Sequence, residues 1–120
     1  MTGQLLRRVL VVEDEILVAM LVEDMVRDLG HEVVGPAMTL DVALQLAEEA
    51  SVDCAILDVN LGEGTPSTPV AVILAARHIP FLFATGYGAA GANSTFATAP
   101  VLEKPFVTRH LDQALRRLLA

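Results

Sequence analysis

The stretch VLVVEDE, residues 9–15, joins four aliphatic residues directly to three carboxylates. The aliphatic part has the length and the β-branched composition of a buried strand. Glu13, Asp14 and Glu15 therefore gather at the end of a segment that belongs in the core. Such a concentration of negative charge is costly unless a positive charge meets it, so the residues brought to this strand end decide the chemistry of the protein.

Apolar runs of strand length recur along the chain, and most are continuous rather than alternating. Continuous runs are typical of a parallel sheet whose two faces are both covered. The runs occupy residues 9–12, 33–34, 54–57, 79–84 and 101–102. Segments with apolar residues three and four apart lie between or after them, at residues 15–29, 39–50 and 108–119. The alternation predicts an α/β fold built from five β-α units.

The sequence predicts the buried face of the first helix and the starting points of the second and third helices. In the first helix the pattern predicts a buried face made of Val18, Leu21, Val22, Met25 and Leu29. The second begins with a possible capping residue, Thr39, and the third is predicted to begin near Pro69, because proline suits a first helical turn. The segment between residues 88 and 98 is rich in glycine and small polar residues, so the fourth helix is expected to be short or irregular.

The length, composition and charge of the chain limit the classes of protein to which it can belong. With 120 residues and 53% apolar residues, the chain is predicted to form one domain over residues 1–120, with its core at about 7–119 and no output domain. The net charge of −7 and the lack of a Lys/Arg run argue against nucleic-acid binding. The single cysteine excludes a disulfide framework, and no apolar run approaches the ~18 residues of a membrane span. We therefore expect a cytoplasmic protein that does not enter a membrane.

Functional groups follow four of the five predicted strands. In an open parallel sheet, sites form at the carboxyl ends of the strands. The groups at these ends are Glu13 and Asp14 after the first strand, Asp58 after the third, Thr85 after the fourth and Lys104 after the fifth. Carboxylate and carbonyl oxygens are the ligands that Mg²⁺ prefers, and Mg²⁺ in such a site commonly carries a phosphoryl group. A lysine and a hydroxyl would bind the remaining phosphoryl oxygens, and a carboxylate can be the acceptor. Asp58, central in the sheet, is the best candidate acceptor.

This constellation resembles the receiver domains of bacterial two-component response regulators. The matching elements are VLVVEDE, the Asp of AILDVNL, the Thr of FATG and the Lys-Pro of LEKPF, and they cover nearly the whole chain. The longer stretch PFLFATGYG is similar to the signature of the FAT GUY subfamily, whose members are mostly stand-alone receivers of alphaproteobacteria. The resemblance implies a flavodoxin-like, doubly wound (βα)5 fold with strand order 2-1-3-4-5.

The resemblance also implies a role for each matching residue. Asp58 would accept a phosphoryl group, and Asp14, Asp58 and the backbone carbonyl of Asn60 would ligate Mg²⁺, for which Mn²⁺ could substitute. Glu13 would bind the metal through water or orient the site, while Glu15 is expected in the first turn of helix one, outside the metal shell.

Three further matching residues would act on the phosphoryl group and its surroundings. Thr85 and Lys104 would each contact a phosphoryl oxygen. Pro105 would shape the following turn, and its peptide bond with Lys104 is commonly cis in the family.

The function implied is that of a single-domain response regulator. It would take its phosphoryl group from a sensor histidine kinase, and then signal by binding a partner or by passing the group to a histidine phosphotransfer protein, in the general stress response of alphaproteobacteria. It would catalyse nothing beyond its own phosphorylation and dephosphorylation. Ile16, Leu17 and Met20 add apolar surface to helix one beyond its buried stripe. They either cover that helix or form the face on which the kinase docks.

The chain departs from the family pattern in two places. Val101 replaces the aromatic residue that many receivers carry three positions before the lysine. We therefore expect the only tyrosine, Tyr87, to take over the switching role, the alternative being a surface aromatic with no such role. Residues 86–102 carry no charge. Because many receivers dimerise through salt bridges in this region, a monomer, or a dimer built another way, is predicted.

Three other functions fit parts of the pattern. A phosphate sink for a kinase is equally compatible with the site residues. A small Mg²⁺-dependent phosphatase would use an aspartyl-phosphate, but it usually has a second acid where this chain has Asn60. A flavodoxin-like FMN module is disfavoured, because the acidic strand end would repel the phosphate of the ligand.

Overall fold

The structure is a computed structural model that describes residues 6–62, 64–86 and 99–120 of the chain. The described residues form a five-stranded sheet in which all neighbouring strands are parallel and lie in the order β2-β1-β3-β4-β5. The strands are β1 (Arg8–Val12), β2 (Glu32–Ala37), β3 (Cys54–Asp58), β4 (Phe81–Thr85) and β5 (Val101–Glu103). The predicted fold class and strand order are confirmed.

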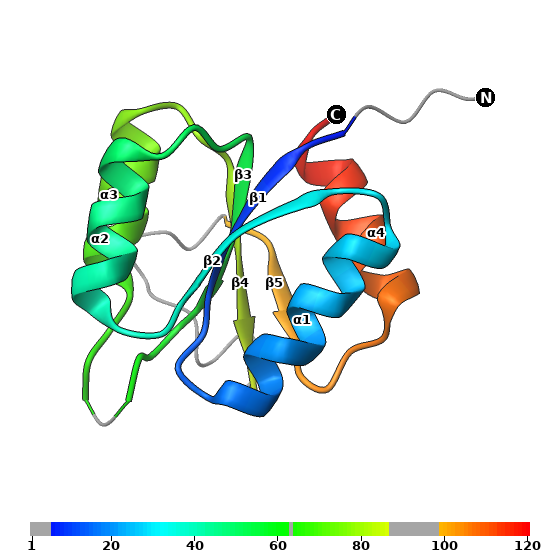
Figure 1. Cartoon of the computed structure of the whole chain (residues 1–120), viewed down its shortest axis with the longest axis horizontal. Coiled ribbons are helices and arrows are strands. Elements are labelled where there is room, and N and C mark those ends of the chain that lie inside the picture. The colour runs from blue at the N-terminus through cyan, green and yellow to red at the C-terminus, as the bar shows by residue number, and fades with distance from the viewer. Residues whose placement is uncertain (1–5, 63, 87–98) are drawn as a thin grey trace.

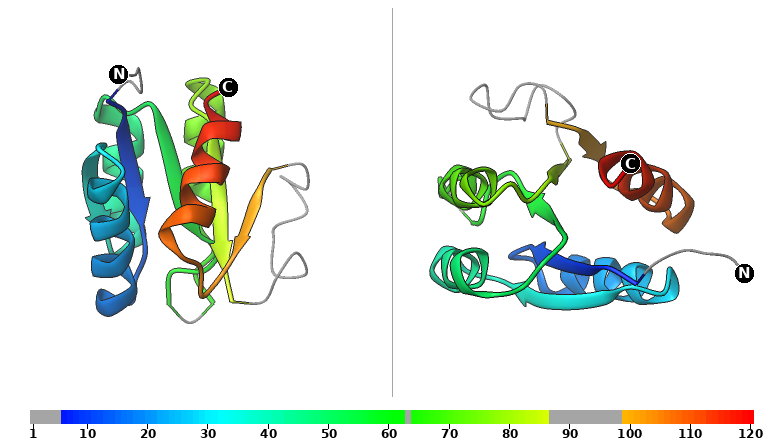
Figure 2. Two further views of the ribbon diagram at one scale, coloured as in Figure 1. Left: turned by 90° about the vertical axis from the view of Figure 1, so that its right-hand side faces the viewer. Right: turned by 90° about the horizontal axis from the view of Figure 1, so that it is seen from above.

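Helices cover both faces of the sheet. The helix pair α2 (Leu40–Glu49) and α3 (Thr68–Ala76) lies on one face, and α1 (Ile16–Asp28) and α4 (Thr108–Leu118) lie on the other (Figures 1 and 2). The helix labelled α4 corresponds to the fifth helix expected from the sequence, while the expected fourth helix, at residues 88–98, falls outside the described residues. Among the described helices, none is both long and apolar enough to cross a membrane.

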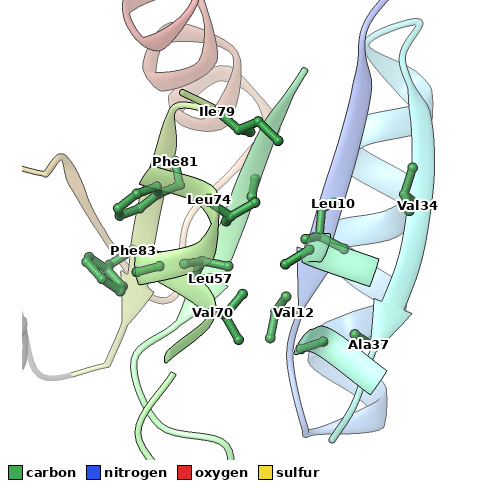
Figure 3. Packing of buried hydrophobic residues seen from close by; sticks show 14 of the residues in the cluster. Leu10, Val12, Val34, Ala37, Leu57, Val70, Leu74, Ile79, Phe81 and Phe83 are labelled. Carbon is green, nitrogen blue, oxygen red and sulfur yellow. The ribbon is translucent and has the colours of Figure 1, made fainter. Parts of the chain in front are cut away.

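Alternate residues of the strands belong to two hydrophobic clusters, one on each face of the sheet. Leu10 and Val12 of β1 point toward α2 and α3, where they join Val70 and Leu74 in the cluster that Figure 3 shows. Val9, Val11 and Cys54 face the opposite way, into the cluster formed with α1 and α4. Because each successive residue of a strand enters one core or the other, the strand is apolar throughout, which is the physical reason for the continuous run at residues 9–12.

The first helix differs in detail from its predicted pattern. Its buried residues are Ala19, Val22 and Val26, while Leu21, which was expected in the buried face, is exposed. The prediction was wrong for Leu21 only, because Val22 is buried and Val18, Met25 and Leu29 are partly buried and pack against the core cluster on this face of the sheet. Glu15 is the N-cap residue of α1 and lies one position before the first turn in which it was expected.

The helices α2 and α3 start where the sequence predicts. Thr39 is the N-cap of α2, and its Oγ1 accepts a hydrogen bond from the backbone N–H of Val42 at 3.3 Å. This satisfies one of the backbone donors that every helix start leaves unpaired. The helix α3 begins at Thr68, and Pro69 lies in its first turn, as predicted.

A glycine in β2 sets the path of the chain beside the end of β1. Gly35 has a φ of +96°, and a Cβ atom at this position would lie 2.6 Å from the backbone nitrogen of Ala37 and 3.0 Å from the carbonyl oxygen of Val11. Only glycine fits such a site. The peptide bond from Gly35 to Pro36 is cis. With this path, the carbonyl of Ala37 accepts the backbone N–H of Glu13 at 3.0 Å, so the acidic segment starts from a fixed point.

Candidate functional site

The carboxyl ends of the strands surround one open cleft of about 700 Å³. The described residues that line it come from the segments after β1, β3, β4 and β5, and they are Asp14, Glu15, Asp58, Val59, Asn60, Gly62, Gly64, Thr85, Gly86 and Lys104. The parallel sheet brings these segments to the same edge, because all its strands end there. The cleft therefore gathers the groups that the sequence analysis assigned to a phosphoryl site.

Two carboxylates, those of Asp14 and Asp58, line this cleft, and the carboxylate of Glu13 lies beside them. Glu13, Asp14 and Asp58 can each offer a carboxylate oxygen such that all three atoms lie within 4.8 Å of one another. The donors are oxygens only, as a hard divalent cation such as Mg²⁺ requires. The chemistry of this donor set therefore fits Mg²⁺.

The ammonium group of Lys104 lies between two of the carboxylates. Its Nζ is 2.6 Å from Oε1 of Glu13 and 3.3 Å from Oδ1 of Asp58. The backbone positions this lysine, because the Lys104 N–H donates a hydrogen bond to the carbonyl of Thr85 at 2.8 Å. The peptide bond from Lys104 to Pro105 is cis, as the resemblance implied.

The charges of the cluster are not balanced. Burial and, after it, the negative charge of Glu13 raise the pKa of Asp58 to about 7, because the positive charge of Lys104 only partly opposes them. Burial acts to lower the pKa of Lys104, but the hydrogen bond with Glu13 and the charge of Asp58 outweigh it, so the net shift is upward. The lysine thus stays charged, yet ionisation of Asp58 remains costly. A further cation beside Asp58 would remove that cost.

Thr85 and Asn60 complete the cleft from β4 and from the loop after β3. Thr85 is the last residue of β4 and is almost fully buried. Its neighbour Ala84 is paired with Asp58 across the sheet, which places the hydroxyl-bearing residue next to the predicted acceptor. Asn60 is exposed at the cleft, and its loop is held by the Ser67 hydroxyl, which donates to the carbonyl of Val59 at 3.1 Å.

The structure therefore brings together Asp14, Asp58, Asn60, Thr85 and Lys104, as the sequence predicted. Glu13 joins the same cluster but is only 3% exposed and does not line the cleft.

Glu15, which was expected outside the metal shell, lines the cleft but does not belong to the three-carboxylate cluster of the described residues. Tyr87, the predicted switch, lies outside the described residues.

A second, apolar groove of about 320 Å³ lies beside the cleft, between α1 and the segment that follows β5. It is lined by Glu15, Val18, Leu21, Val22, Met25, Lys104, Pro105 and Phe106. The adjoining surface of α1 carries large apolar side chains in contact with solvent: Ile16 is 62% exposed, Leu17 73%, Met20 53% and Leu21 58%. The helix is thus not simply covered by the rest of the described chain. Exposed apolar clusters of this kind mark binding surfaces.

Known proteins resemble this chain in sequence and in structure. Residues 9–116 match the model of the response regulator receiver domain. In sequence, 81 residues of the chain are 37% identical to the phyllosphere-induced regulator PhyR of Methylorubrum extorquens; the match covers 66% of this chain and 30% of PhyR. The chain thus spans less than half the length of the curated relatives it matches.

Solved structures show the same similarity over nearly all of the chain. The solution structure of SdrG from Sphingomonas melonis Fr1 superposes with a TM-score of 0.85 at 48% identity, covering 96% of this chain and 98% of SdrG. SdrG has also been solved in a BeF3-activated conformation, which superposes with a TM-score of 0.80. The receiver domain of the sensor histidine kinase PA1611 from Pseudomonas aeruginosa, 24% identical and covering 96% of this chain and 98% of its own, shares the fold with a TM-score of 0.81; its structure holds a magnesium ion in the active-site cleft.

Proposed function

Because this chain belongs to the family of response regulator receiver domains, we propose that Asp58 accepts the phosphoryl group of a sensor histidine kinase. The observation that carries the proposal is the position of Asp58. Its carboxylate lies at the end of β3, in one cluster with the carboxylates of Glu13 and Asp14 and 3.3 Å from the Lys104 ammonium. A carboxylate between a cation site and a lysine can act as a nucleophile toward a phosphoryl group whose oxygens both cations would neutralise.

The transfer is a single displacement at phosphorus. A carboxylate oxygen of Asp58 forms a P–O bond while the P–N bond to the kinase histidine breaks. The electron pair of the broken bond stays on the imidazole nitrogen, which then takes a proton from solvent. Lys104 and the Thr85 hydroxyl each contact one phosphoryl oxygen of the resulting acyl phosphate. They act by holding its geometry and its charge.

Receiver domains bind Mg²⁺ at their acidic site, and we propose the same for this chain. Asp14, Asp58 and the backbone carbonyl of Asn60 would hold the ion, with Mn²⁺ able to take its place. When bound, it supplies positive charge to the oxygens of the group being transferred. Two observations support this assignment: the all-oxygen donor set and the raised pKa of Asp58, which results from burial and, after it, from the negative charge of Glu13.

Receiver domains act through kinases and other partner proteins, and α1 is the proposed docking face. Ile16, Leu17 and Met20 are all more than half exposed on this helix, next to the apolar groove and to the cleft. A partner that carries a phosphohistidine on an apolar helical surface would bury these side chains while its imidazole reaches Asp58. A histidine phosphotransfer protein would use the same face.

The output of the protein is proposed to be partner binding or phosphotransfer, rather than catalysis on an external substrate. Its similarity to SdrG and PhyR supports a place in the general stress response. No specific feature of the described site favours a phosphatase, a flavin-binding module or a phosphate sink that only removes phosphoryl groups from a kinase.

Beryllofluoride, which mimics an acyl phosphate, tests the proposal directly. In ¹H–¹⁵N spectra of the protein with Mg²⁺, it should shift the amides of Asp58, Thr85 and Lys104, and the shifts should vanish when EDTA replaces Mg²⁺. Asp58→Asn removes the nucleophilic carboxylate at nearly constant shape and should show no response. Equal responses of the wild type and this variant would rule out Asp58 as the acceptor.

A further inference from the structure

The edge strand β2 contains a bulge directly beside the acidic end of β1. Leu10 of β1 is paired with Val34 of β2. The next pair in this register joins Val12 to Ala37, so β2 has advanced three residues while β1 has advanced two. The extra residue falls in the segment Gly35–Pro36. Bulges of this kind bend a strand and redirect the residues that follow, and they are frequent next to active sites.

The extra residue decides which side chains of β2 reach the core. In a regular strand, residues that point to the same face are two positions apart. Val34 and Ala37 are three positions apart, yet both belong to the cluster that packs between the sheet and the helices α2 and α3 (Figure 3). The bulge therefore lets Ala37, which is fully buried, enter the core at the level where β1 ends.

Ala37 also holds the backbone of the acidic segment. Its carbonyl accepts the backbone N–H of Glu13 at 3.0 Å, one residue beyond the end of β1. Asp14, which lines the cleft and is proposed to ligate Mg²⁺, follows directly. On its other side, β1 is paired with β3 up to Val12. The bond to Ala37 thus fixes the point at which the backbone leaves the sheet toward the cleft.

Only glycine allows this arrangement at position 35. A Cβ atom on Gly35 would lie 2.6 Å from the nitrogen of Ala37 and 3.0 Å from the carbonyl oxygen of Val11. Both are backbone atoms, so no rotation of a side chain can relieve the contacts. The chain would have to move either Ala37, whose carbonyl holds Glu13, or the end of β1. In both cases the displacement reaches the acids, and Mg²⁺ tolerates little displacement, because it requires near-octahedral geometry at about 2.0–2.1 Å.

We propose that Gly35 is a positioning residue for the phosphorylation site, although it does not line the cleft. It acts through the bulge, the carbonyl of Ala37 and the backbone of Glu13, which together set the position of Asp14. The inference rests on the proposed function, since it concerns the support of a proposed metal ligand. Its consequence is that β2, none of whose residues lines the cleft, controls the affinity for Mg²⁺.

A second glycine provides a matched control. Gly30 has a φ of +89°, close to the +96° of Gly35, but a Cβ atom there would meet no heavy atom of the described chain within 4 Å beyond its chain neighbours. It precedes β2, at the opposite end of that strand from the cleft. Gly30→Ala and Gly35→Ala both carry the unfavourable φ, and only Gly35→Ala adds the contacts with the backbone. The difference between the two variants therefore isolates the effect of the bulge on the site.

Mg²⁺ binding gives the first readout. It is followed through the ¹H–¹⁵N shifts of Asp58 and Asn60, at a temperature at which each variant is folded. Gly35→Ala should weaken Mg²⁺ binding by roughly tenfold or more, which is the usual loss when the support of a metal ligand is removed. Gly30→Ala should stay within about twofold of the wild type, because it is distant from the site. Equal affinities of the two variants, whether both weakened or both normal, would overturn the proposal.

Hydrogen exchange in EDTA gives a second readout that needs neither metal nor phosphate. The amide of Glu13, which is bonded to Ala37, should exchange slowly relative to the amides of β3 in the wild type and in Gly30→Ala, and faster in Gly35→Ala. The comparison with β3 removes the effect of a global loss of stability, which speeds the exchange of all these amides together. Unchanged protection of the Glu13 amide in Gly35→Ala would refute the link through Ala37.

Should Gly35→Ala fail to fold, Gly35→Asn and Gly30→Asn enter the same comparison with the same criteria, because asparagine tolerates a positive φ better than alanine but keeps the Cβ atom. If Mg²⁺ binding depends on Gly35 as predicted, but the wild type gains no phosphoryl group from acetyl phosphate, the role of Gly35 stands and the proposed function is contradicted. If the wild type is phosphorylated with Mg²⁺ while Gly35→Ala binds Mg²⁺ normally, the proposed function stands and the role of Gly35 is wrong.

Discussion

The carboxyl group of Asp58 lies where burial and the negative charge of Glu13 both oppose its ionisation, and its pKa rises to about 7. In the unfolded chain the same group has the ordinary value of an aspartate, near 4. Between these two values the native protein holds a proton that the unfolded chain has released. By linkage, metal-free stability therefore falls as the pH rises through this window, and the loss is complete above about pH 7.

This effect predicts how an Asp58→Asn variant behaves without metal. The side chain of Asp58 is only 14% exposed, so the variant should be more stable than the wild type at pH 8 by roughly 1–3 kcal/mol, and close to it at pH 4. Urea unfolding in EDTA at both values measures the difference. Asp24→Asn, at an exposed position of α1, is the control and should show little difference. A wild-type advantage at pH 8 would contradict the assignment.

At the scale of elements, α2 depends on a side chain from its neighbour. The last turn of α2 has no basic residue of its own. Instead, Arg77, at the end of α3, donates hydrogen bonds from one guanidinium nitrogen to the carbonyls of Ala47 and Ala50. These carbonyls lie at the negative end of the α2 dipole, where a cation is favourable.

Removing this contact should cost stability without touching the site. Arg77→Met is expected to lower the free energy of unfolding by about 1.5–3 kcal/mol, which is the range for hydrogen bonds to a charged group. Arg109→Met, an exposed arginine in the first turn of α4, should change it by less than about 0.5 kcal/mol. Denaturant melts give both values. Phosphorylation by acetyl phosphate should be unaffected in both variants. If Arg77→Met and Arg109→Met are equally stable, the hydrogen bonds from Arg77 to α2 do not contribute to stability.

The exposed face of α1 makes a separate prediction about partners. Replacing Ile16 and Leu17 by serine should slow phosphotransfer from a cognate histidine kinase by roughly tenfold or more, because apolar contact area is lost at the docking face. Uptake from acetyl phosphate, which needs no docking, should stay within about twofold.

The control for this experiment lies on the other side of the sheet. Val72 on α3 is 51% exposed, and Val72→Ser should leave both rates unchanged. If Ile16→Ser/Leu17→Ser slows both phosphoryl donors equally, the defect is in the site and α1 is not the docking face.

At the scale of the whole molecule, the position of the acids ties metal binding to stability. The chain has a net charge of −7, and part of that charge is concentrated at one end of the sheet. Saturating Mg²⁺ should therefore raise the free energy of unfolding, by about 1–3 kcal/mol at a large excess over its dissociation constant. The gain should be small or absent in Asp14→Asn. Thermal unfolding of the wild type and of Asp14→Asn, each with Mg²⁺ and with EDTA, measures this gain. If Mg²⁺ leaves the midpoint of the wild type unchanged, the proposed metal site is wrong.

Most of the fold could be predicted because its determinants are local in sequence. Continuous apolar runs mark strands covered on both faces, and the order of strands and helices leaves few ways to build a parallel sheet. The rotation of α1 could not be predicted, because Leu21 satisfies the helical period as well as Val26 does, and only packing against β1 separates them.

In the site, the positions of the strand ends predicted Asp14, Asp58, Thr85 and Lys104. The bond between Glu13 and Lys104 could not be predicted, because the two residues are 91 positions apart and their partners depend on side-chain geometry.

The account rests on Asp58 as an acceptor that works only with a divalent cation beside it. Intact-protein mass spectrometry after incubation with acetyl phosphate tests this most directly, with Mg²⁺ or EDTA, for the wild type and Asp58→Asn. The account predicts a single added phosphoryl group in the wild type with Mg²⁺, and none in the other three samples. Phosphorylation of Asp58→Asn to the same extent, or of the wild type in EDTA, would contradict it.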